Sequence, residues 1–331
     1  LQEVAAAWRQ RFRIPVLGVT GSNGKTTLKE MMSAIMRAHV RQPGDDGGVL
    51  ATWGNLNNHV GVPITLLWLR PEHQAAVIEM GASAKGEIGL LTRIARPTVG
   101  VITNAGPAHL GGFGGTVRDV AEAKGELFAG LAPGAVAVVN RDDSFHDYWR
   151  ALGKDLQYRS FGLAPDADFR AVDIAASNGE DLRFRIVSPA GEVAINLPMA
   201  GSHNIQNALA AAAAAMRLGV SAAEVAAALA TFPGLAHRLE EIGRHRIELR
   251  AGGLRAAELR GDSNGGERSC GFGAGLPRTR RALDGRCLHL RFQRKRCVGG
   301  AARAAARARA VAAQRERRHA VLAAGVVAEF D

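Results

Sequence analysis

A glycine-rich loop between a strand-like and a helix-like segment constrains this chain more than any other feature. Residues 14–20 form a short apolar run rich in β-forming residues, which favours a buried parallel strand. Residues 28–40 carry apolar side chains at helical spacing. Residues 21–27, between them, read Gly-Ser-Asn-Gly-Lys-Thr-Thr. This order is typical of a phosphate-binding loop, in which backbone N–H groups and a helix N-terminus point at an anion.

The side chains of this loop suit a nucleoside triphosphate. Lys25 has the reach to contact the β- and γ-phosphates, and the hydroxyl group of Thr26 is a suitable Mg²⁺ ligand. The spacing departs from the usual pattern, because Val19 stands where a glycine is expected. An ordinary glycine turn is the alternative, and the flanking elements argue against it. The predicted nucleotide-binding residues of the loop are Gly21, Ser22, Asn23, Gly24, Lys25, Thr26 and Thr27.

Further strand-like segments follow at the spacing of an α/β protein. Apolar runs that end at or near a polar residue lie at 75–80, 99–104 and 135–140, with helical patterns between them. The alternation predicts an α/β fold with a doubly wound parallel sheet. Ligands of such sheets bind beyond the carboxyl ends of the strands, where Glu79, Asn104 and Asn140 are expected. Glu79 interrupts an apolar strand, so it needs a partner if it is buried, and a metal ion would serve.

Two other candidates have plain structural alternatives. His109 lies in a glycine-rich loop, and a histidine in such a place is more often a surface residue or a satisfied core residue. Lys124 lies in a predicted helix, 117–131, three or four residues from apolar members of its packed face. It is expected to lean towards the sheet. A lysine that extends along the edge of that face towards water is the alternative.

A small antiparallel meander and an alanine-rich helix follow. Alternating, β-forming segments predict the meander at 167–176, 182–188 and 192–197. Ser202 is a suitable N-cap for the helix that comes next. Asn204 and Asn207 share a face of that helix, where their amides could pair with the edge of a base. Capping and simple exposure are the alternatives.

The net charge of +11 is concentrated at the C-terminal end. Residues 1–243 contain 22 Lys+Arg and 23 Asp+Glu, whereas residues 244–331 contain 20 and 8. The second segment is poor in large apolar residues and shows no βαβ period. It could be a nucleic-acid-binding arm, a divergent domain or the out-of-frame translation of a GC-rich gene. The last explains the excess of Arg, Ala and Gly best. Aromatic residues for base stacking are scarce there, so no nucleic-acid partner is expected.

Composition also bears on the compartment. No run of about 18 apolar residues occurs, so no membrane-spanning helix and no membrane partner are expected. The N-terminus lacks the pattern of a signal peptide, and three cysteines do not make a disulfide scaffold. The cytoplasm is therefore the expected compartment. A monomer is the expected form of the chain.

Several motifs, in order, resemble the Mur ligases. They stand at 20–27, 54–67, 79–88, 104–110, 123–126, 201–209 and 237–238, so the match covers about residues 5–240. Two of them resemble the MurF branch most: Gly-Asn-Leu-Asn-Asn-His-Val-Gly-Val-Pro at 54–63, and the block that opens with Glu-Met-Gly-Ala-Ser at 79. The resemblance implies a central ATP-binding domain at 14–240. It also implies an ATP-dependent ligase that joins D-Ala-D-Ala to UDP-MurNAc-tripeptide through an acyl phosphate, in peptidoglycan precursor synthesis.

Motif positions imply roles for individual residues, with ATP and Mg²⁺ as cofactors and small molecules as substrates. Lys124 matches the lysine that becomes carbamylated in this family, which would bring a negative oxygen near Mg²⁺. Asn204 and Asn207 would face the adenine, and Arg238 the γ-phosphate region. The implied catalytic residues are Lys25, His109 and Lys124. The implied metal ligands are Thr26, Glu79, His109 and Lys124, although Mg²⁺ prefers oxygen to the nitrogen of a histidine.

The chain departs from its relatives at both ends. MurF-like proteins carry a uridine-binding domain before the glycine loop and a Rossmann-like domain after the central one. Residues 1–13 look like the last helix of the first, so we expect a remnant of a missing domain there. Residues 241–331 lack the motif that opens the second and are expected not to be a native ligase domain. Other Mur-type or folylpolyglutamate-type ligases, or a fragment that binds ATP without ligating, remain alternatives.

Overall fold

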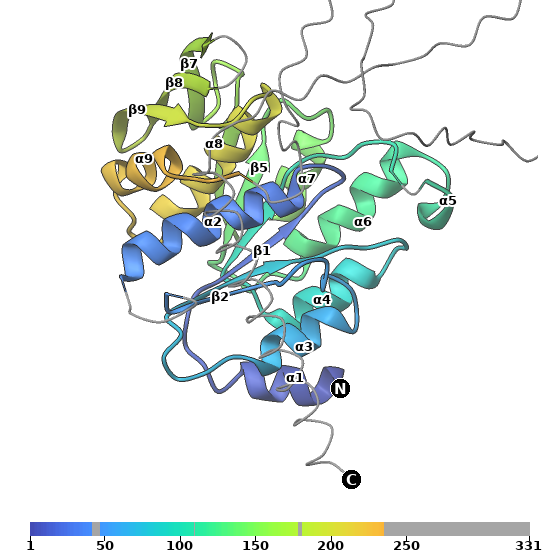
Figure 1. Ribbon diagram of the computed structural model, residues 1–331. Helices are drawn as coiled ribbons and strands as arrows, with labels where there is room; N and C mark the ends of the chain where they lie inside the picture. The colour runs from blue at the N-terminus through green and yellow to red at the C-terminus, as the bar shows by residue number, and fades with distance from the viewer. Residues whose placement is uncertain (42–46, 109, 178–180, 235–331) are drawn as a thin grey trace, which may run out of the picture. The chain divides into compact units, whose positions relative to one another are not determined.

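The computed structural model describes residues 1–41, 47–108, 110–177 and 181–234 (Figure 1). Its strands are β1 (Val16–Thr20), β2 (Val49–Ala51), β3 (Ala75–Glu79), β4 (Val99–Ile102), β5 (Val136–Asn140), β6 (Gln157–Gly162), β7 (Phe169–Ser177), β8 (Asp181–Ser188) and β9 (Gly191–Leu197). Its helices are α1 (Gln2–Arg9), α2 (Lys25–Val40), α3 (Gly61–Leu67), α4 (Glu87–Ala95), α5 (Leu110–Phe113), α6 (Val117–Ala129), α7 (His146–Leu152), α8 (His203–Met216) and α9 (Ala222–Ala230). The strands form one sheet in the order β2-β3-β1-β4-β5-β6-β7-β8-β9.

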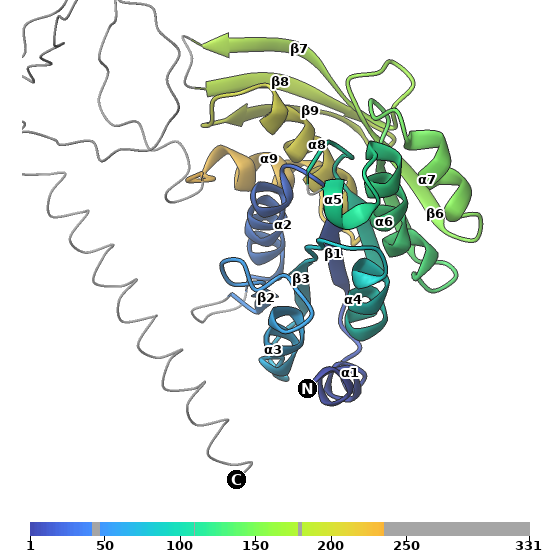
Figure 2. The same cartoon turned by 90° about the vertical axis from the view of Figure 1, so that its right-hand side faces the viewer.

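The sheet is parallel from β2 to β7 and is covered by helices on both faces. Every residue of β1, β3, β4 and β5 is buried, as expected for strands packed on both sides. Leu17 of β1 packs in a core cluster with α2, α8 and α9, whereas its neighbour Val16 packs in a second cluster with α1, α3, α4, α6 and α7. Figure 2 shows α2 on one side of β1 and β3, with α4 and α6 on the other. The predicted doubly wound parallel sheet is confirmed.

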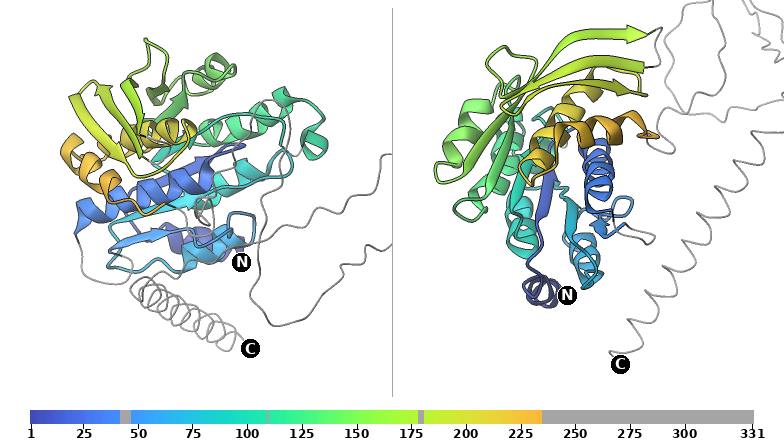
Figure 3. Two further views of the ribbon diagram at one scale, coloured as in Figure 1. Left: turned by 45° about the horizontal axis from the view of Figure 1, so that its top comes forward. Right: turned by 90° about the vertical axis from the view of Figure 1, so that its left-hand side faces the viewer.

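The antiparallel meander of β7, β8 and β9 is present, but it extends the main sheet. The connection is a short parallel pairing in which Phe161 and Gly162 of β6 lie beside Phe169 and Arg170 of β7. The three strands then curve over α8 and α9, with β9 in contact with α9 and β7 in contact with α8 (Figure 3). One continuous core therefore includes the meander and the sheet face under α2 and α8.

Local signals set most helix boundaries. Gly24 adopts a left-handed conformation as the N-cap of α2, so the helix begins at Lys25, before its apolar pattern does. Ser221 caps α9 in a reciprocal arrangement with Glu224. Ser202 occupies the N-cap position of α8, but its side chain makes no capping hydrogen bond, because its backbone is already helical.

The N-terminal helix α1 packs on α3 and α4, so residues 1–13 are part of the described unit. That they are the remnant of a preceding domain stays a prediction. The basic segment 241–331 lies outside the described residues. Its three interpretations therefore stay predictions. Within the described residues, no helix is long and apolar enough to cross a membrane.

Candidate active site

The glycine loop passes directly from β1 into α2 and leaves no room for side chains at two positions. Gly21 has φ +145°, and a Cβ atom there would lie 1.9 Å from the hydroxyl oxygen of Thr103. Gly24 has φ +83°, and its Cβ would lie 2.6 Å from the side-chain oxygen of Asn207. These approaches require glycine, and they bring the segment after β4 and helix α8 against the loop.

The segment that follows β4 holds the glycine loop in place through hydrogen bonds. The backbone N–H of Ser22 donates to the carbonyl oxygen of Asn104 at 2.9 Å, and that of Asn23 donates to the Asn104 side-chain oxygen at 3.0 Å. The Thr103 hydroxyl donates to the Asn23 carbonyl at 2.6 Å, and the Gly106 N–H donates to the Ser22 hydroxyl at 2.9 Å. Asn104, which was expected at the end of this strand, thus fixes the conformation of the loop together with Thr103 and Gly106.

Lys25 lies over the loop to which it belongs. Its Nζ atom donates to the carbonyl oxygens of Gly21 and Ser22, at 2.7 and 3.1 Å. It also lines a cavity of about 300 Å³ together with Lys124, Asn57 and other residues from the carboxyl edge of the sheet. An anion in this cavity would meet two lysine ammonium groups.

Glu79 is a buried carboxylate at the carboxyl end of β3, with 2% of its surface exposed. Its Oε1 atom accepts hydrogen bonds from the Asn57 amide at 2.8 Å and the Thr26 hydroxyl at 3.4 Å. Its Oε2 atom is buried and has no hydrogen-bond partner among the residues that the structure describes. A buried, half-satisfied carboxylate beside a hydroxyl group is a site that a hard cation would complete.

Lys124 leans inwards from α6, as expected, and is only 3% exposed. Burial, and to a smaller extent the nearby charge of Lys25, lower its pKa from 10.5 to about 8. Its Nζ atom lies 5.1 Å from the centre of the Phe113 ring. The alternative of a lysine extended to water is therefore wrong. The low pKa leaves more of this amine neutral, and hence nucleophilic, near neutral pH.

Asn204 and Asn207 lie on one face of α8, as their spacing indicates. Asn207 donates from its amide to the Asn204 side-chain oxygen at 3.2 Å, and Asn204 donates to the Ala200 carbonyl at 2.7 Å. Asn207, together with Gly24 and Phe161, lines a cavity of about 100 Å³ next to the loop. Asn207 therefore borders open space, while Asn204 orients it from behind. Both are buried, so the alternative of simple exposure is wrong.

The fold thus brings most of the predicted residues to one edge of the sheet. His109 and Arg238 lie outside the described residues, so their predicted roles remain predictions. No group of three or more His, Cys, Asp or Glu side chains that could hold a metal occurs among the described residues; the predicted ligand set draws instead on Thr26 and a modified Lys124. Sequence reasoning assigned no role to Asn57 or to Thr52, whose hydroxyl accepts from the Glu79 N–H at 2.9 Å. Asn57 stands in the 54–63 motif, which was the available signal.

Comparison with known proteins is consistent with this geometry. The sequence profile of the Mur ligase middle domain matches residues 19–215. UDP-N-acetylmuramoyl-tripeptide--D-alanyl-D-alanine ligase of Escherichia coli (strain K12) is 41% identical over 239 residues, which are 72% of this chain and 51% of that protein. The chain spans about half the length of the curated relatives it matches.

Solved structures agree with the sequence comparison. A crystal structure of MurF from Acinetobacter baumannii superposes with a TM-score of 0.68 at 38% identity, over 73% of this chain and 51% of that one. The MurF ligase of Thermotoga maritima in complex with ADP superposes with a TM-score of 0.59 at 28% identity, over 68% and 51%. Because the middle-domain profile covers more than half of its length, the chain belongs to the Mur ligase family.

Proposed function

We propose that this chain carries the ATP-using centre of an amide ligase that joins D-Ala-D-Ala to UDP-MurNAc-tripeptide. The observation that supports this most is the junction of the glycine loop, the buried Glu79 and the buried Lys124 at one edge of the sheet. Two relatives that bear the name of this ligase are 41% and 39% identical to the chain, over 239 and 229 residues. A carboxylate is a poor acyl donor, so phosphorylation by ATP activates it, and the dipeptide amine then displaces phosphate through a tetrahedral intermediate.

In this proposal the protein acts by position and charge more than by covalent chemistry. The N–H groups of the loop and the N-terminus of α2 cradle the phosphates. The Lys25 ammonium group, now on the Gly21 and Ser22 carbonyls, would move onto the β- and γ-phosphates. Asn207 lies close enough to Gly24 to flank the nucleotide, and we assign the adenine to its side of the loop. His109 and Arg238 keep their proposed roles near Mg²⁺ and the γ-phosphate.

The Glu79 site fits Mg²⁺. Its donors are the free carboxylate oxygen of Glu79 and the Thr26 hydroxyl, and oxygen is the ligand that Mg²⁺ prefers. Bound Mg²⁺ would neutralise charge on the phosphates. Glu79→Gln keeps the size and the hydrogen bonds of the side chain but removes its charge. We expect it to raise the Mg²⁺ concentration needed for half-maximal nucleotide binding by about 100-fold, whereas Glu72→Gln at an exposed position does not. An unchanged Mg²⁺ requirement would exclude Glu79 as a ligand.

Lys124 is proposed to be carbamylated. Its neutral amine would attack carbon dioxide, form the N–C bond and release a proton, so that a cation becomes an anion. The lowered pKa of about 8 supports this step, because only the unprotonated amine reacts. The new carboxylate would face the same cavity as Lys25.

Acceptor choice tests the substrate assignment. The chain is incubated with ATP, Mg²⁺ and UDP-MurNAc-tripeptide as the acyl donor, and D-Ala-D-Ala, glutamate or diaminopimelate is supplied as the amine acceptor. We expect a product with D-Ala-D-Ala only. A product with glutamate or diaminopimelate alone would favour a folylpolyglutamate-type or other Mur-type ligase. We further propose that the reaction takes place in the cytoplasm on a monomer, and sedimentation of the purified chain tests the second point.

A further inference from the structure

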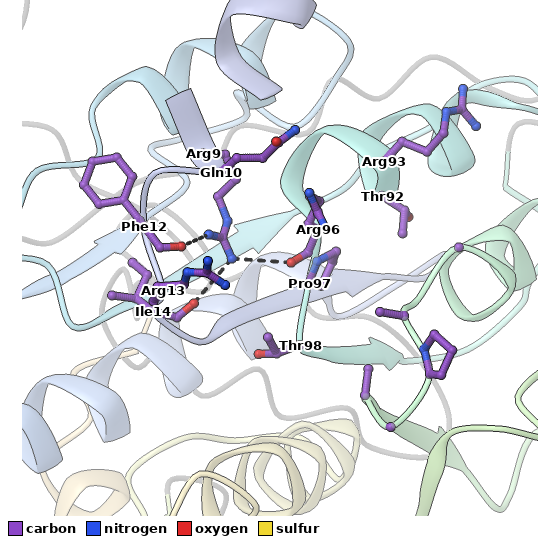
Figure 4. Close-up of a pocket in the computed structure, with 15 residues that line it drawn as sticks. Arg9, Gln10, Phe12, Arg13, Ile14, Thr92, Arg93, Arg96, Pro97 and Thr98 are labelled. Carbon is purple, nitrogen blue, oxygen red and sulfur yellow. Dashed lines mark hydrogen bonds between the residues drawn. The ribbon is translucent and has the colours of Figure 1, made fainter. Parts of the chain in front are cut away.

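A second cavity lies at the opposite edge of the sheet (Figure 4). Its volume is about 920 Å³, within the range of small-molecule sites. The segments that lead into β1, β4 and β5 line it, together with the C-terminal end of α4. The candidate active site lies where these strands end. Since β1 has five residues, the two edges are about 15 Å apart.

Positive charge gathers in the lining of this amino-edge cavity. Four of its lining residues are arginines, and no Asp or Glu lines it within the described part of the chain. Residues 1–243 as a whole contain nearly equal numbers of basic and acidic residues. The four arginines are Arg9, Arg13, Arg93 and Arg96. The basic character of the cavity is therefore a local arrangement and does not reflect the composition of the unit.

One of the four arginines has a structural role. The buried Arg9 donates to the carbonyl oxygens of Phe12, Ile14 and Arg96, at 2.7, 3.3 and 3.4 Å (Figure 4). It also donates to the carbonyl oxygen of Ala95 at 2.9 Å. Burial lowers its pKa, and the charge of Arg96 lowers it further, so two guanidinium groups repel each other here.

The other three arginines are free to bind. The residues Arg13, Arg93 and Arg96 are exposed, and their guanidinium groups make no hydrogen bond or ion pair with the described residues. Arg96 also has a left-handed backbone, with φ 47° and ψ 64°, at the C-cap of α4. Glycine or asparagine is usual at such a position. Arginine there adds backbone strain to charge repulsion, which is a pattern found at ligand sites.

We propose that the amino-edge cavity binds a small, multiply charged phosphate-type anion through Arg13, Arg93 and Arg96. The planar guanidinium group matches two phosphate oxygens at once, and a bound anion would offset the repulsion that involves Arg9. The competing explanation is that Arg93 and Arg96 merely complement the partial negative charge at the end of α4. It requires no ligand and gives no role to Arg13, which lies outside that helix.

Calorimetric titration with inorganic pyrophosphate tests the proposal on the full chain. We expect the double variant Arg93→Gln/Arg96→Gln to lose at least tenfold in affinity, and Arg13→Gln to lose about threefold. Arg11→Gln is the matched control, because it removes the same charge from the same segment without touching the cavity lining. Lys25→Ala separates the two edges: it should leave the arginine-dependent binding unchanged. Equal losses in Arg11→Gln and the double variant, or no loss in the double variant, would overturn the proposal.

A second measurement uses only the wild-type chain, so it does not depend on whether a variant folds. Phenylglyoxal modifies accessible arginines, and mass spectrometry of the wild-type chain reports each site separately. Pyrophosphate should protect Arg13, Arg93 and Arg96 at least threefold more than the exposed Arg11. Protection that is equal at all four sites would contradict a built anion site.

Discussion

At the carboxyl edge of the sheet, Lys25 and Lys124 share a cavity close to the buried Glu79 carboxylate, whereas the amino-edge cavity presents arginines and, within the described ranges, no carboxylate. Both edges border the same parallel strands. The charges at each edge determine what that edge can do. Opposite charges at one place can hold a metal ion and phosphates together and support phosphoryl transfer, whereas guanidinium groups alone can only hold an anion.

The largest expected effect concerns the loop lysine. Lys25→Ala removes the ammonium group that would meet the transferred phosphate, so ATP turnover should fall by about 1000-fold or more. Lys154→Ala, an exposed lysine on the same unit, should leave turnover unchanged. A coupled assay measures the release of ADP and phosphate from ATP. Normal activity in the Lys25 variant would remove the reason to treat the two edges as chemically different.

Lys124 sharpens the comparison, because only the carboxyl edge would convert a cation into an anion. Lys124→Ala should lower ligase activity by about 100-fold, and short carboxylic acids should restore part of it by supplying the missing carboxylate. In the wild-type chain, the ligase activity regained on addition of bicarbonate should increase with pH. The increase should level off near the lowered Lys124 pKa of about 8, not near 10.5. Failure of every short acid to rescue the variant would count against carbamylation.

At the amino edge, Arg9 has a structural role, whereas the other arginines of the cavity are proposed to bind an anion. Arg9→Met removes the donor from the hydrogen bonds that four carbonyl oxygens accept. The free energy of unfolding should therefore fall by about 3 kcal/mol. Arg93→Gln affects an exposed group and should change it by no more than about 0.5 kcal/mol. Urea denaturation measures both. Similar values for the two variants would contradict this division.

The smallest expected effect concerns Asn57, which positions Glu79. Asn57→Ala removes the 2.8 Å hydrogen bond to Oε1, so the carboxylate would be free to turn, and the Mg²⁺ requirement should rise about tenfold. The exposed Asn55, in the same motif, provides the control Asn55→Ala. If kcat at saturating Mg²⁺ fell while the Mg²⁺ requirement stayed constant, Asn57 would have another role.

The contrast between the edges also marks what the sequence could predict. The loop and the strands before and after it follow from local patterns: the left-handed N-cap of α2 falls on Gly24, and β3 lies within its predicted apolar run, ending at Glu79, one residue before the end of that run. The pairing of Asn57 with Glu79 joins a loop to the end of β3, 22 residues further along the chain, so no spacing rule reveals it. Short elements such as β2, with three residues, carry too little periodicity to be predicted.

The amino-edge cavity was not predictable for a related reason. Arg13, Arg93 and the turn near Gly134 are distant in sequence and meet only because β1, β4 and β5 lie side by side. Likewise, the meander was predicted from its alternation, but its attachment to the sheet rests on the register of β6 with β7. Sequence patterns identify elements, while sites made by several loops appear only with the topology.

The most direct test of the central claim follows one oxygen atom. The tripeptide substrate is prepared with ¹⁸O in its terminal carboxylate and incubated with the chain, ATP, Mg²⁺ and D-Ala-D-Ala, and the released phosphate is analysed by mass spectrometry. Activation through an acyl phosphate at the carboxyl edge predicts one ¹⁸O atom in each phosphate and pentapeptide as the other product. Phosphate without the label, or ATP bound with no pentapeptide formed, would contradict the account.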